Sequence, residues 1–80
     1  MTISQATSKR IDEFLFSRGI SLYQLAKDAG LPIATLQNLY RGTTKSPTLA
    51  VIMKICVGLN VTVAEFLDRD YFSLSVIELE

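Results

Sequence analysis

Few side chains in this 80-residue sequence could catalyse a reaction or hold a metal ion. The chain has no histidine and a single cysteine, Cys56, which excludes an internal disulfide and a cysteine-rich metal site. Two carboxylate pairs occur, Asp12 with Glu13 and Asp68 with Asp70, but each falls where surface or capping roles are more common than acid–base catalysis. The sequence also lacks a glycine-rich phosphate loop. We therefore expect no enzyme activity, no metal and no cofactor.

The same composition bounds the class of protein. A lone thiol fits a reducing cytoplasm, and Cys56 falls where a small core residue would lie. The chain has no run of about 18 apolar residues, the length that a membrane span needs. Its first ten residues lack the apolar segment of a signal peptide. We expect one cytoplasmic domain with a modest core.

Charge is distributed unevenly along the chain. Eight basic and eight acidic residues give a formal net charge of zero. Residues 1–60 carry seven basic and three acidic side chains, whereas residues 61–80 carry one basic and five acidic. A basic body could face the phosphates of a nucleic acid while the acidic end points away. Ordinary solvated surface explains the distribution equally well, so charge alone leaves both interpretations open.

Residues 21–42 carry the clearest structural signal, two short helices joined by a tight turn. Ser21 and Gln24 have the spacing of a capping box, which predicts the start of the first helix. Gly30 and Gly42 stand where left-handed residues would end the two helices. Helices this short need the support of others. Their expected inner residues, at helical spacing, are Leu22, Leu25, Ala26, Ala29, Leu36, Leu39 and Tyr40.

A longer helix is predicted before this pair. It is capped by Thr7 or Ser8 and ends at Gly19, while residues 1–6 form either a lead-in or an extra helical turn. Phe16 lies off the apolar side and is either a second core contact or an exposed aromatic residue. The expected inner residues are Ile11, Phe14 and Leu15.

Two helices are predicted after a polar loop. The first starts at Thr48 or at Ser46, and Gly58 within it indicates a close approach to another helix. Thr62 and Glu65 form a capping box that starts the second. The expected inner residues are Leu49, Ile52, Met53, Cys56 and Leu59 for the first, and Val63, Phe66 and Leu67 for the second.

Residues 71–80 form a tail after a domain of residues 1–70. Phe72, Leu74 and Val76 alternate with serines, a pattern typical of a strand. A single strand leaves its backbone groups unpaired. We therefore expect either dimerisation through the same strand of a second copy or an irregular arm packed on its own domain.

The order of these signals resembles the Cro and phage-repressor type of helix-turn-helix domain, also called the XRE family. The resemblance covers residues 9–67 and implies an all-α, five-helix, lambda-repressor-like DNA-binding domain, here with a short extended C-terminal tail. The sequence departs from the family at Leu22, where a phosphate-binding Gln is common, and at Leu15 and Tyr40, which replace an Arg–Glu ion pair at little cost. The residues that carry the resemblance are Leu25-Ala26, Gly30, Gly42, Ser46-Pro47 and Val61-Thr62.

The resemblance implies that the second helix of the pair enters the major groove. There, Gln37 and Asn38 can each make two hydrogen bonds to adenine, and apolar side chains can touch a thymine methyl group, which predicts an A·T-leaning half-site. The implied base-contacting residues are Ile33, Ala34, Gln37 and Asn38. The implied backbone-contacting residues are Ser21, Leu22, Thr35, Arg41, Thr43, Thr44 and Lys45.

We expect a sequence-specific DNA-binding transcriptional regulator, a repressor of phage or plasmid type. It would act as a homodimer on double-stranded DNA, with half-sites about one helical turn, roughly 34 Å, apart. We expect no membrane association and no small-molecule ligand. The alternative is a protein-interaction module on the same fold, an antitoxin or an anti-repressor partner, with little DNA binding. The neutral net charge, the apolar residues Leu22, Ile33 and Phe16, and the apolar tail favour that alternative.

Overall fold

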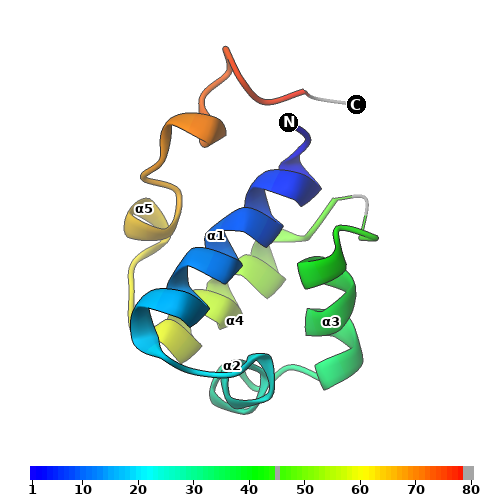
Figure 1. The fold of residues 1–80 in the computed structure, drawn as a ribbon, viewed down its shortest axis with the longest axis vertical. Coiled ribbons are helices and arrows are strands. Elements are labelled where there is room, and N and C mark those ends of the chain that lie inside the picture. The colour runs from blue at the N-terminus through cyan, green and yellow to red at the C-terminus, as the bar shows by residue number, and fades with distance from the viewer. Residues whose placement is uncertain (45, 79–80) are drawn as a thin grey trace.

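Helices α1 and α4 cross the middle of the molecule, α2 lies at one end, and α3 and α5 flank opposite sides (Figure 1). The computed structural model describes residues 1–44 and 46–78. Within this part of the chain there is no strand, which confirms the all-α prediction, and no helix is both long and apolar enough to cross a membrane. The elements are α1 (Ile3–Arg18), α2 (Leu22–Ala29), α3 (Ile33–Arg41), α4 (Leu49–Leu59), α5 (Val63–Phe66) and a 3-10 helix, η1 (Asp70–Phe72).

Helix α1 begins earlier than expected. Thr2 is its N-cap: the Thr2 hydroxyl accepts a hydrogen bond from the Gln5 amide at 3.1 Å, and the Gln5 side chain accepts one from the Thr2 amide at 2.9 Å. The predicted caps at Thr7 and Ser8 are therefore wrong. Thr7 is buried within α1 and donates its hydroxyl hydrogen to a carbonyl one turn earlier. Most of residues 1–6 thus belong to an extra helical turn.

The turn between α2 and α3 has the predicted geometry. Gly30 adopts a φ of 67°, a left-handed conformation that glycine reaches without a steric penalty. Its amide donates to carbonyl groups in the last turn of α2. At the start of α2, the Ser21 hydroxyl accepts from the Gln24 amide at 3.1 Å. The predicted capping box is only half formed, because the Gln24 side chain donates to Asp28 instead.

Helices α4 and α5 begin after the N-caps Thr48 and Thr62, as predicted. The Thr62 hydroxyl accepts from the Glu65 amide at 3.0 Å, and the Glu65 carboxylate accepts from the Thr62 amide at 3.2 Å. Gly58 lies directly against α2, because a Cβ atom at this position would be 2.8 Å from the amide nitrogen of Ala29. The predicted close approach of two helices is therefore confirmed.

The core lies between α1, α2, α3 and α4, and α5 adds one aromatic side chain to it. Cys56 is among the buried residues, and burial raises the pKa of its thiol. Phe14 and Leu15 pack against the core, whereas Phe16 on the same helix is exposed. The largest fully buried apolar side chains are Ile11, Leu25, Leu36, Leu39, Ile55, Leu59 and Phe66.

Four residues expected on inner faces lie outside the core. Leu49, Met53 and Leu67 are exposed, and Tyr40 lies at the surface. Because α4 is apolar on nearly every side, its periodicity allows more than one inner face. In the structure, Ile55 takes the inner position that Met53 was expected to occupy.

The tail forms an irregular arm on its own domain, the second of the two predicted arrangements. Residues 71–78 contain the end of η1 and a turn, and the predicted strand is absent from them. A single parallel β-bridge joins Glu78 to Thr2. The Tyr71 hydroxyl donates to the Glu13 carboxylate at 2.6 Å, which holds the arm to α1. The last two residues lie outside those described.

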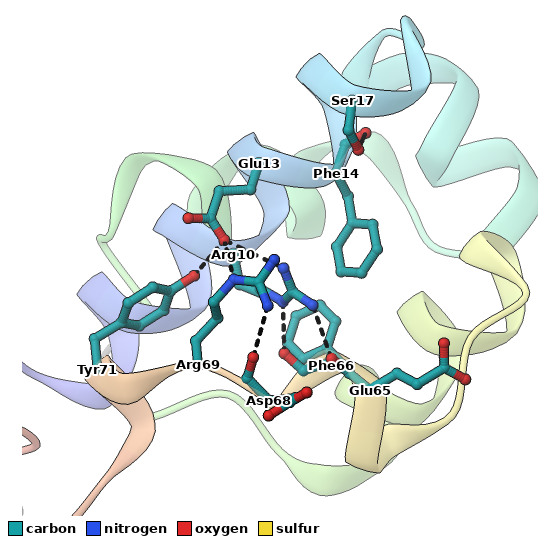
Figure 2. A network of polar contacts seen from close by, with 9 residues as sticks. All are labelled: Arg10, Glu13, Phe14, Ser17, Glu65, Phe66, Asp68, Arg69 and Tyr71. Carbon is teal, nitrogen blue, oxygen red and sulfur yellow. Dashed lines mark hydrogen bonds and ion pairs between the residues drawn. The ribbon is translucent and has the colours of Figure 1, made fainter.

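Arg10 joins α1 to α5 (Figure 2). Its guanidinium is buried and donates to the backbone carbonyls of Glu65 and Phe66, each at 2.7 Å. It also donates to the Glu13 carboxylate at 3.2 Å, and Arg69 forms a second ion pair with that carboxylate at 3.4 Å. These bonds fix α5 and the start of the arm in place.

Glu13 is the shared acceptor of this network. Partial burial raises its pKa, but hydrogen bonds from Tyr71 and Arg10 and the charge of Arg69 outweigh that effect and hold the pKa below its ordinary value of 4.5. Burial and the bond to Glu13 raise the pKa of Tyr71. The pairing is therefore strongest when Glu13 is ionised and Tyr71 is protonated.

Candidate nucleic-acid interface

Helix α3 turns a polar face away from the core. Leu36 and Leu39 are buried, whereas Ala34 and Asn38 are exposed and Gln37 is half-buried. Residues 34 and 38 are four apart and thus lie on one side of the helix, and residue 41 continues that side. We call these residues, Ala34, Gln37, Asn38 and Arg41, the α3 face. The helix lies at the edge of the molecule (Figure 1).

The other residues of α3 that were predicted to contact DNA are less exposed to solvent. Ile33 is half-buried and packs against the core, so only part of its side chain could reach a base. Thr35 is also half-buried. Of the four residues expected to contact bases, the structure leaves Ala34 and Asn38 most accessible.

The first turn of α2 offers backbone donors. Ser21 provides the acceptors for the amides of Gln24 and Leu25, its hydroxyl and its carbonyl oxygen, each at 3.1 Å. The amides of Leu22 and Tyr23 have no acceptor among the described residues, so they can bind an anion. The Leu22 side chain packs against the core, which leaves its amide as the group suited to a phosphate.

The loop after α3 is anchored on the same helix. The amide and the hydroxyl of Thr43 both donate to the carbonyl of Asn38 at 3.0 Å. Arg41 is exposed in the last turn of α3, and Thr44 is half-buried. The prediction for Lys45 falls outside the described residues. The structure thus brings Arg41 and Thr43 to the end of the α3 face.

Helix α1 positions the C-terminal end of α3 through a contact that sequence reasoning missed. The Tyr40 hydroxyl donates to the Asp12 carboxylate at 2.6 Å, and this bond raises the pKa of Tyr40. The Ser8 hydroxyl donates to the Tyr40 carbonyl. Residues of both helices line a recess of about 390 Å³ here, among them Lys9 and Arg41. From the sequence, Asp12 was interpreted only as a surface charge, because no neighbouring residue indicated a hydrogen bond to Tyr40.

Three basic side chains of α1 make contacts within the molecule. Arg10 is buried and donates to α5 and to Glu13. Arg18 donates to the carbonyl of Leu59, and Lys9 lies 4.8 Å from the centre of the Tyr71 ring. Burial therefore removes Arg10 from the basic surface, whereas Arg41 at the end of the α3 face stays exposed.

Two short helices at a tight turn, with the second exposed on its outer side and three further helices in support, define a helix-turn-helix domain. The family model of the Cro/C1-type HTH DNA-binding domain matches residues 10–70. The chain belongs to this family, as its sequence motifs predicted. Neither the curated proteins nor the solved structures compared with the chain gave a significant match.

Proposed function

We propose that this chain is a sequence-specific DNA-binding transcriptional regulator, a repressor of phage or plasmid type, that places α3 in the major groove. The observation that carries the proposal is the exposed α3 face, with Asn38 at its centre and Leu36 and Leu39 buried beneath it. The major groove is about 12 Å wide and admits one helix. Membership of a DNA-binding family supports the same use of α3.

Base recognition would depend on two amides and a methyl group. The side chains of Asn38 and Gln37 each carry a donor and an acceptor, which match N7 and N6 of adenine. The methyl group of Ala34 lies on the same side of the helix and suits the methyl of thymine. An A·T-leaning half-site follows from these three residues.

Phosphate contacts would flank the groove. The free amides of Leu22 and Tyr23 sit at the positive end of α2, and Arg41 and Thr43 lie at the other end of the α3 face. Such contacts orient the protein without reading the sequence. A second copy would bind a second half-site about one helical turn, roughly 34 Å, away.

Selection of preferred duplexes from a random pool, followed by titration at rising salt, tests this proposal. We expect the Kd to rise steeply with salt, because bound phosphates release counterions. Asn38→Ala should weaken binding to the preferred duplex by about five- to 150-fold, the value of one bidentate base contact, and leave non-specific binding nearly unchanged. Arg41→Gln should reduce the salt slope by about 1. Lys54→Gln on α4 removes the same charge and serves as the control.

A Kd that does not change with salt, or a pool that yields no preferred sequence, would contradict the regulator. A protein that shifts no duplex but binds another protein, and loses that binding on Asn38→Ala, would identify the interaction module instead. Circular dichroism of each variant checks that the fold is unchanged.

A further inference from the structure

We propose that two copies of this chain associate through an apolar surface on the outer side of α4. We call it the apolar face and define it as Leu49, Met53 and Val57 of α4 with Leu67 and Leu74 beside them. The inference extends the proposed function, on which its biological role rests, by naming the surface that would hold two copies together.

The α4 part of this face is a continuous stripe. Leu49, Met53 and Val57 are spaced four residues apart, so they line one side of the helix. They are 65%, 51% and 75% exposed, although the sequence pattern suggested that the first two would be buried. The opposite side of α4 is already occupied, because α4 packs on α2 and α5.

A groove extends this stripe toward the C-terminal arm. It has a volume of about 400 Å³ and is lined mainly by apolar side chains from α1, from α4 and from the arm. Leu49 belongs to both the stripe and the groove, and Leu67 and Leu74 also line the groove. Leu74 is 83% exposed at the turn of the arm. The stripe and the groove therefore form a single surface.

The size of the apolar face matches what a dimer needs. A standard interface buries about 800 Å² on each partner, and about 65% of a homodimer interface is apolar, which corresponds to roughly 500 Å². From their exposed fractions, the five residues offer roughly 600 Å² of accessible surface. That is the upper end of the range, about 300–600 Å², for the largest apolar patch on a typical monomer.

A second copy is the occupant that this surface fits. In a two-fold dimer each patch meets its own copy, so a charged patch would repel itself whereas an apolar one does not. Helix α4 carries a single charged residue, Lys54. The α3 face would stay open, because α3 packs on α1 and α2 rather than on the outer side of α4.

Sedimentation of the full chain from about 1 to 200 μM tests the inference, because this range spans the Kd of weak and moderate dimers. We expect the wild-type protein to dimerise. Met53→Glu and Val57→Glu each place two like charges in the interface and should raise the dimer Kd by at least about tenfold. Phe16→Glu is the matched control: Phe16 is 90% exposed on α1, outside the apolar face, and its variant should stay within about twofold of wild type. Circular dichroism confirms that all variants are folded.

A wild-type chain that remains monomeric across the range, free and on DNA, overturns the inference, and so does a Met53→Glu variant that associates as well as wild type. A dimer lost equally in Phe16→Glu also overturns it. Duplex titrations in the same buffers separate this result from the proposed function. A dimer without salt-dependent DNA binding contradicts only the regulator, whereas a monomer that binds its duplex contradicts only the apolar face.

Discussion

Helices α3 and α4 each turn an outer face away from the same core, and the two faces differ in chemistry. The α3 face presents Asn38 and Arg41, whose polar groups are well solvated until a ligand replaces the water. The apolar face presents Leu49, Met53 and Val57, which gain from leaving water. Each 100 Å² of that surface that becomes covered contributes about 2.5 kcal/mol.

The difference shows how one small core can serve two kinds of partner. A polar face makes directional bonds and can select a base sequence, whereas an apolar face is non-directional and provides area. Because the two faces lie on different helices, a substitution in one should leave the other intact. The following predictions test that separation.

The largest expected effect is the difference in unfolding free energy between two leucine-to-alanine variants, one buried beneath the α3 face and one exposed on the apolar face. Leu36 is fully buried under the α3 face, so Leu36→Ala should lower the free energy of unfolding by about 2–5 kcal/mol. Leu49→Ala, at an exposed position, should change it by less than about 0.5 kcal/mol. Urea denaturation of both variants, at a concentration where the chain is monomeric, measures the difference. Equal losses would mean that Leu49 is packed in the free chain and that the apolar face is not open.

Gly58→Ala tests the contact between α2 and α4, which joins the helix-turn-helix pair to the helix that carries the apolar face. The added methyl group would meet the backbone of α2 at Ala29, 2.8 Å from its nitrogen and 2.9 Å from its Cα, so α2 and α4 must separate. We expect a loss of about 1–3 kcal/mol in unfolding free energy, with weaker DNA binding and weaker association together. Thermal denaturation measures the loss. A variant at least as stable as wild type would show that helix propensity outweighs this contact.

Acid should loosen the arm, which carries Leu74 of the apolar face, before it loosens the α3 face. The pKa of Glu13 is lower in the folded chain than its ordinary value of 4.5, so its contribution is complete above that value and is lost as the pH falls through the folded pKa. Glu13 is half-exposed, which limits the effect to about 1 kcal/mol. As the pH is lowered below 4.5, amide hydrogen exchange should show earlier opening around Tyr71 than in α3. Glu13→Gln should abolish this pH dependence, and a profile that matches wild type would rule out Glu13 as its source.

Features set by neighbouring residues were predictable from the sequence. The turn at Gly30, the cap at Ser21 and the capping box of Thr62 with Glu65 each depend on a few consecutive residues, and all are present. Asn38 was expected to be exposed and it is, although its contact with a base stays a prediction. The cap at Thr2 has the same kind of local signal and could have been found.

Features set by distant residues were not predictable. Arg10 bonds to carbonyl groups 55 and 56 residues away, so its burial depends on where α5 packs. The bond from Tyr40 to Asp12 spans 28 residues in the same way. The alternating pattern of residues 71–78 is typical of a strand. The element that lies nearest to this segment is the helix α1, and the arm packs on it instead.

Because Cys56 is buried, chemical labelling of its thiol can measure how often the chain unfolds. The sequence contains no other thiol, and this one is buried in the core with a raised pKa. An alkylating reagent needs an exposed thiolate, so it must wait for the helices to part. The labelling rate of the native chain, divided by that of the denatured chain, therefore gives the fraction of molecules in which the core is open. No added probe is needed.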